Sequence, residues 1–90
     1  MGYLETVRDF VIENFLFGED GMLKEETSFL DSGIIDSTGI LELIAFLEEI
    51  YGLTIGDEEI VPENFDTLGN VVRFLERKMF PPAGRGILPR

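Results

Sequence analysis

Apolar side chains recur every three or four residues between residues 37 and 51, and no other feature of the chain constrains its fold so strongly. Such spacing is typical of a helix with one broad buried face; the apolar positions are Ile40, Leu41, Leu43, Ile44, Leu47, Ile50 and Tyr51. Asp36 or Ser37 precedes the pattern as an N-cap, and Gly52 follows it as a helix stop. We therefore predict a central helix of about 15 residues, roughly 22 Å long.

Two further segments repeat this spacing, one on each side of the central pattern. The first should end near Phe17, because Gly18 follows it; its apolar positions are Leu4, Val7, Phe10, Val11 and Phe15. The second runs from Thr67, a good N-cap, to about Lys78; its apolar positions are Leu68, Val71, Val72, Phe74 and Leu75. Each segment predicts a helix with one apolar face.

The connections between the predicted helices differ in length. Residues 18–36 indicate a long loop; its apolar residues Met22, Leu23, Phe29, Leu30, Ile34 and Ile35 should hold it over the core. A loop of this length in a small domain usually has a function. Residues 57–61 predict a short turn of helix before Pro62. The Pro-Pro-Ala-Gly run after residue 80 should end regular structure, so residues 81–90 are expected to form a flexible tail.

The composition limits how such a chain can be stabilised. With 90 residues, 44% of them hydrophobic, it can form one small core, and with no Cys it has no disulfide to support that core. Packing alone must hold it, which favours helices. We predict one all-α domain over residues 1–80, a four-helix bundle of three main helices and one short helix, and every apolar face should be core.

The charge balance indicates the kind of partner. The chain has 18 acidic and 7 basic side chains, and all the acidic ones lie in residues 1–80. This surface should repel nucleic acid and anionic membranes and attract basic faces of proteins; acidity that only keeps the chain soluble is the alternative. The absence of Cys and of a secretory signal at residues 1–5 favours a cytoplasmic protein.

The missing residue types also bear on catalysis. The chain has no His and no Cys, so it lacks the commonest general base, nucleophilic thiol and metal ligands. Asp31, Asp36 and the acidic run at residues 57–59 lack the alternating ligands of a calcium loop, so we expect no metal site. These absences argue against an enzyme.

One short motif stands out from this background. Gly33 is followed after two residues by Asp36 and Ser37, at the start of the central helix. In this motif, in the order of its helices and in its long first connection, the chain resembles the phosphopantetheine-binding carrier proteins: acyl, peptidyl and D-alanyl carriers. The resemblance extends from about Tyr3 to Met79.

The resemblance implies a function and a site. In the family the Ser hydroxyl receives 4'-phosphopantetheine from coenzyme A, and by position that residue is Ser37, with Asp36 supporting it. The arm would carry an acyl or aminoacyl group as a thioester between biosynthetic enzymes. The implied partners are a phosphopantetheinyl transferase, an acyl- or aminoacyl-activating ligase and downstream synthase or tailoring enzymes, which dock on the second helix of a monomeric carrier.

Four residues are candidates for that docking surface: Thr38, Glu42, Glu48 and Glu49. They follow Ser37 or lie on the expected outer face of the central helix. A solvated face with no partner is the alternative for each glutamate.

The cargo is less constrained than the site. Gly39, two residues after the Ser, is similar to D-alanyl carriers, and residues 60–67 are similar to stand-alone peptidyl carriers that hold an aminoacyl thioester. Both clues favour a small aminoacyl group over a fatty or polyketide chain. The alternative function is an interaction module that keeps the carrier fold without the cofactor.

Overall fold

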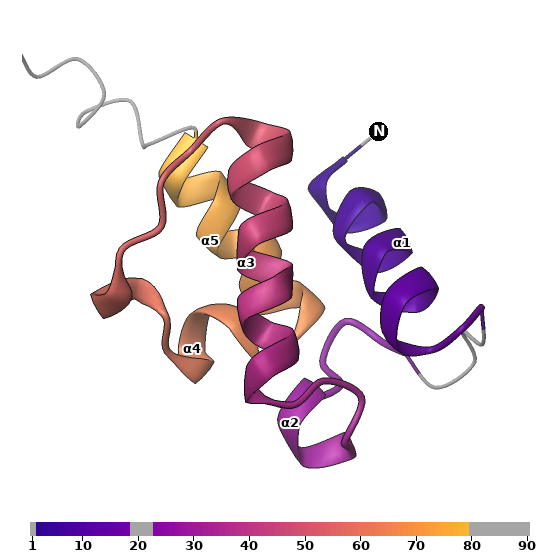
Figure 1. The fold of residues 1–90 in the computed structure, drawn as a ribbon. Coiled ribbons are helices and arrows are strands. Elements are labelled where there is room, and N and C mark those ends of the chain that lie inside the picture. The colour runs from indigo at the N-terminus through magenta and orange to yellow at the C-terminus, as the bar shows by residue number, and fades with distance from the viewer. Residues whose placement is uncertain (1, 19–22, 80–90) are drawn as a thin grey trace, which may run out of the picture.

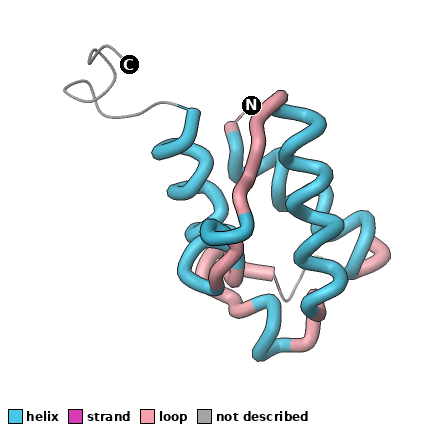
Figure 2. The backbone as a smooth tube through the Cα atoms, turned by 60° about the vertical axis from the view of Figure 1, so that its left-hand side comes forward, coloured by secondary structure: helices cyan, strands magenta, loops and turns pink. Residues whose placement is uncertain are grey.

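The computed structural model describes residues 2–18 and 23–79, which form three long helices and two short ones (Figure 1). The long helices are α1 (Tyr3–Phe15), α3 (Ser37–Tyr51) and α5 (Leu68–Met79). The short ones are α2 (Phe29–Ser32) and α4 (Pro62–Phe65), and a single 3₁₀ turn covers Asp57–Glu59. The described chain is helix and loop throughout, which confirms the all-α prediction (Figure 2).

The three long helices share one hydrophobic core. Each contributes side chains with no exposed surface; these are Val7 and Val11 of α1, Leu43 and Leu47 of α3, and Val71 and Leu75 of α5. Leu23, Phe29 and Ile35 of the first connection are also buried, so these residues lie over the core as predicted. Met22 lies outside the described residues.

Two residues of the predicted apolar face of α3 are exposed. Leu41 and Ile50 belong to the apolar pattern of α3, yet their exposed fractions are 56% and 51%. The prediction that every apolar position of this helix is buried is therefore wrong. Periodicity identifies a broad apolar stripe, but the neighbouring helices cover only part of its width.

The boundaries of α1 and of the first connection also differ from the predictions. Helix α1 ends at Phe15, two residues before the predicted end, and Phe17 has a left-handed backbone with a φ of 53°. The first connection is not loop throughout, because Ser28 caps the short helix α2 by accepting a hydrogen bond from the Asp31 backbone N–H at 3.0 Å. A hydroxyl at this position satisfies one of the free N–H groups of a helix start.

The connection between α3 and α5 contains its short α-helix after the predicted turn and not at it. The predicted turn at residues 57–61 is the 3₁₀ turn Asp57–Glu59, and Pro62 begins α4. Proline suits the first position of a helix because the N–H that it lacks would have no partner there. Thr67 caps α5 as predicted, since its Oγ1 accepts a hydrogen bond from the Asn70 backbone N–H at 3.0 Å.

One remaining prediction concerns the C-terminal end of the chain. The predicted tail at residues 81–90 lies outside the described residues. Within the part of the chain that the structure describes, no helix is long and apolar enough to cross a membrane.

Candidate functional site

The N-terminus of α3 carries the motif that the sequence singled out. Asp36 is the N-cap: its Oδ1 accepts a hydrogen bond from the Gly39 backbone N–H at 2.8 Å. Of the two N-caps that the sequence left open, the structure therefore selects Asp36. Ser37 is then the first residue of α3, and Asp36, Ser37 and Thr38 are all exposed.

This location gives the Ser37 hydroxyl a particular electrostatic setting. It lies at the positive end of the dipole of a 15-residue helix. The first turn of α3 itself contains no acidic residue that would oppose a bound anion. A helix start of this kind favours a phosphate group.

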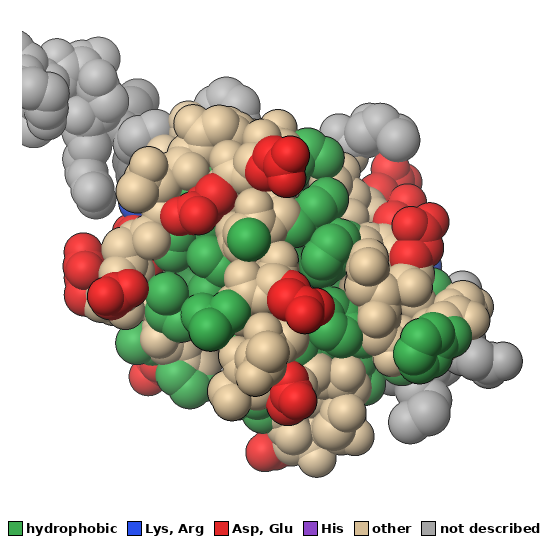
Figure 3. Space-filling view, viewed as in Figure 1, with side chains coloured by type: hydrophobic (Ala, Val, Ile, Leu, Met, Phe, Trp, Pro, Cys, Tyr) green, Lys and Arg blue, Asp and Glu red, His purple; other side chains and the backbone are tan. Residues whose placement is uncertain are grey.

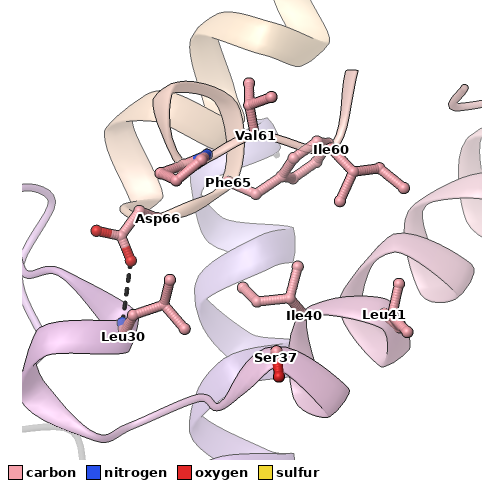
Figure 4. A pocket seen from close by; sticks show the side chains of 9 residues that line it. Leu30, Ser37, Ile40, Leu41, Ile60, Val61, Phe65 and Asp66 are labelled. Atoms are coloured by element: carbon pink, nitrogen blue, oxygen red, sulfur yellow. Dashed lines mark hydrogen bonds between the residues drawn. The ribbon is translucent and has the colours of Figure 1, made fainter. Parts of the chain in front are cut away.

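A mostly apolar groove of about 300 Å³ opens beside Ser37 (Figure 4). One wall is the start of α3, with Ser37, Ile40 and Leu41, and the facing wall comes from α2 and from the segment that ends in α4. The facing residues are Leu30, Ile60, Val61, Pro62, Phe65 and Asp66. In Figure 4 the Leu30 and Ile40 side chains approach each other across the groove, with Ser37 at its lower edge.

The exposed apolar residues of this region lie around the same groove. Leu30, Leu41 and Val61 are 43%, 56% and 37% exposed, and all three line it. Sequence reasoning missed these residues as part of the site: Leu30 and Leu41 were interpreted as packing on the core, and Val61 as part of a short helical turn. A cluster of exposed apolar side chains usually marks a surface that binds a ligand or a partner.

Gly39 positions α3 against the end of α1. A β-carbon at position 39 would lie 2.6 Å from Cγ2 of Ile35 and 2.8 Å from Cε1 of Phe15. Real β-carbons do not approach other heavy atoms so closely. In sequence Gly39 indicates a similarity to D-alanyl carriers, and the structure adds a packing reason for a glycine at this position.

The four predicted docking residues occupy two kinds of position. Thr38, Glu42 and Glu49 are exposed. Glu48 is half-buried, and its Oε2 accepts a hydrogen bond from the Ile55 backbone N–H at 2.8 Å, which holds the chain after α3. On the face that carries α3, acidic side chains lie among hydrophobic ones (Figure 3). Thr38 and Glu42 line one pocket together with Asp36, and Glu48 makes a structural contact further along the helix.

No protein-family model matches the chain. The chain is 35% identical over 75 residues to the probable acyl carrier protein PigG of Serratia sp. strain ATCC 39006, an alignment that covers 82% of this chain and 86% of PigG. The chain belongs to the acyl carrier protein family.

Two further similarities support the assignment of the chain to this family. It is 27% identical over 63 residues to the D-alanyl carrier protein of Abiotrophia defectiva, which covers 68% of this chain and 80% of that one. The solution structure of the holo acyl carrier protein of Nitrosomonas europaea superposes with a TM-score of 0.72 at 30% identity, covering 88% of this chain and 98% of that one. The three-dimensional match extends over the helices that position Ser37.

Proposed function

We propose that Ser37 bears the 4'-phosphopantetheine arm on which this carrier protein holds its acyl or aminoacyl cargo. The observation that carries the proposal is the exposed Ser37 hydroxyl at the first position of α3, directly after the Asp36 cap. Residues 1–80 are the carrier domain in this proposal.

The residues at this helix start fit a phosphodiester. The positive end of the α3 dipole favours the phosphate charge, and the exposed position leaves the hydroxyl accessible to a modifying enzyme. When bound, the arm supplies the thiol that a chain without Cys lacks. The carrier's own residues present the attachment point and shield the cargo.

The groove beside Ser37 would receive the apolar part of the cargo. Its volume of about 300 Å³ is at the small end of ordinary ligand sites, so a short acyl chain or an apolar amino-acid side chain suits it better than a long chain. Gly39 no longer discriminates between cargoes, because packing against Phe15 is enough to explain it. Similarity to a D-alanyl carrier protein supports a small aminoacyl group.

The proposed partners supply all the catalysis. A phosphopantetheinyl transferase attaches the arm, an acyl- or aminoacyl-activating ligase loads it, and synthase or tailoring enzymes use the cargo. The carrier itself is not an enzyme in this proposal, and a chain without His or Cys fits that role. It acts as a monomer in the cytoplasm.

Intact-mass spectrometry tests the proposal directly. Incubation with a promiscuous phosphopantetheinyl transferase and coenzyme A should add the mass of one phosphopantetheine to the wild-type chain and none to Ser37→Ala. Ser32→Ala is the matched control, because Ser32 is a neighbouring exposed serine in α2; it should be modified normally. A wild-type chain that several transferases leave unmodified would instead favour the cofactor-free interaction module.

A further inference from the structure

The carboxylate of Asp66 joins the two segments that form the facing wall of the groove. Its Oδ2 accepts a hydrogen bond from the Ser28 hydroxyl at 2.5 Å, and its Oδ1 accepts one from the Leu30 backbone N–H at 3.0 Å. The Asp66 backbone carbonyl accepts a third, from the Phe29 N–H at 2.7 Å. Three bonds thus fix the start of α2 against the end of α4, across more than thirty residues of sequence.

These bonds lie at the edge of the groove itself. Leu30 and Asp66 both line the groove, and Figure 4 shows the bond between them at one end of it. The Leu30 side chain extends from this bond toward Ile40 on the opposite wall. Loss of this bond would let Leu30 move relative to Ile40 on the opposite wall, and so change the width of the groove.

The same contacts lead toward the attachment point. The Phe29 backbone carbonyl accepts a hydrogen bond from the Ile35 N–H at 3.2 Å, two residues before Ser37. The Ser28 hydroxyl that donates to Asp66 also caps α2 by accepting from the Asp31 N–H. Asp66 is therefore linked through α2 to the segment that leads into α3.

We propose that Asp66 is a positioning residue that sets the width of the groove beside Ser37 and so determines which cargo the carrier shields from water. The inference rests on the proposed function, because it needs an arm on Ser37. Charge on the carboxylate strengthens hydrogen bonds to it, so a neutral side chain at position 66 would hold α2 less firmly. The wall would then move and lose its fit to a short apolar cargo.

The test compares two cargoes on four proteins. A promiscuous transferase, supplied with acetyl- or hexanoyl-coenzyme A, places the acyl-phosphopantetheine group on wild type, Asp66→Ala, Asp66→Asn and Thr67→Ala. The hydrolysis rate of each thioester in mild base is then measured. Amide chemical shifts of Leu30 and Ile60, compared between the two cargoes, report directly on the groove walls. Thr67→Ala is the matched control, because it removes the adjacent helix cap without changing a groove-lining residue.

The wild type and Thr67→Ala should hydrolyse the hexanoyl thioester severalfold more slowly than the acetyl one. Asp66→Ala should lose that difference in rate. It should also lose the difference in the amide chemical shifts of Leu30 and Ile60 between the two cargoes. Asp66→Asn keeps an acceptor for the Leu30 N–H and should lie between. The inference would be overturned if a folded Asp66→Ala protein kept the wild-type difference in hydrolysis rate between the two thioesters. Loss of that difference in Thr67→Ala as well would also overturn it. Intact mass separates the two proposals: a chain that takes no arm fails the proposed function, and a loaded chain with unchanged shielding fails this one.

Discussion

The backbone of Gly39 lies so close to Phe15 that a β-carbon at position 39 would come within 2.8 Å of the ring carbon Cε1. This approach fixes the end of α1 against the start of α3, two residues after the proposed attachment site. Phe15 is held in turn by Phe10, whose ring stacks on Phe46 of α3 with a centroid distance of 4.1 Å. The position of Ser37 therefore depends on an aromatic contact between two helices.

Substitution of Gly39 should be costly although the residue lies in a helix. Gly39→Ala gains helix propensity of about 1 kcal/mol, but the added methyl group overpacks the contact with Phe15 and Ile35, which costs about 1–3 kcal/mol. We expect a net loss of stability in urea denaturation. Gly69→Ala is the control, because its β-carbon would meet Arg73 Nη1 at 3.4 Å, an ordinary contact; it should be neutral or stabilising. Similar losses in both variants would contradict this explanation.

Asp36 should have two separable roles, capping and recognition. Asp36→Ala removes the hydrogen bond to the Gly39 N–H and should destabilise the chain by about 1 kcal/mol. Asp36→Ser keeps a capping oxygen and should recover most of that stability in the same urea titration. If Asp36→Ser is as stable as wild type yet is modified more slowly by the transferase, the carboxylate itself is recognised. Normal modification of Asp36→Ser would restrict Asp36 to capping.

Glu59 should make the stability of the folded chain depend on pH in the acid range. The hydrogen bond from the Lys78 ammonium group, at 2.8 Å, lowers the pKa of Glu59 from its ordinary value of 4.5, and the bond from the Gly56 backbone N–H lowers it further. Because the pKa is lower in the folded state, Glu59 stabilises the fold at pH values above its ordinary pKa. This contribution is lost as the pH falls through the pKa of the folded state. Glu59→Gln should therefore cost up to about 1 kcal/mol near neutral pH.

Thermal melts at a series of pH values check this prediction. The difference in melting temperature between wild type and Glu59→Gln should be greatest near neutral pH and disappear in acid. A constant difference across that range would mean that packing, and not the charge of Glu59, is responsible. Salt should reduce the neutral-pH difference, because the ion pair is partly exposed.

The exposed and half-buried glutamates of α3 should respond differently to charge reversal. Glu42→Lys and Glu49→Lys place a positive charge on exposed positions, so they should slow encounter with a basic partner at low salt and leave stability nearly unchanged. Glu48→Lys should also lower stability, because it loses the bond to the Ile55 N–H. Initial rates of phosphopantetheinylation across salt concentrations, with urea titrations alongside, separate the effects. Rates independent of salt would mean that the acidic face only confers solubility.

The sequence was sufficient for the main helices and for the site motif because those signals are local. Apolar spacing along α1, α3 and α5 reflects helix periodicity, and the Asp36–Ser37 motif reflects the needs of a helix start. Even the choice between Asp36 and Ser37 as the cap needed backbone geometry, because both residue types can accept the same bond. The role of Ser37 in attachment stays a prediction until its modification is measured.

The groove and the contacts around it depend on residues far apart in the chain. Periodicity counts Leu41 and Ile50 as apolar, but only the positions of the neighbouring helices leave them exposed. The bonds of Asp66 to Ser28 and Leu30 cross more than thirty residues, and the contact of Gly39 with Phe15 joins two helices. The sequence alone therefore determined the three main helices and the placement of the Ser37 motif, since these follow from interactions within one turn or one helix. Only the tertiary structure decided which apolar surface stays open beside Ser37 and which carboxylate holds its wall, since both depend on how separate helices pack.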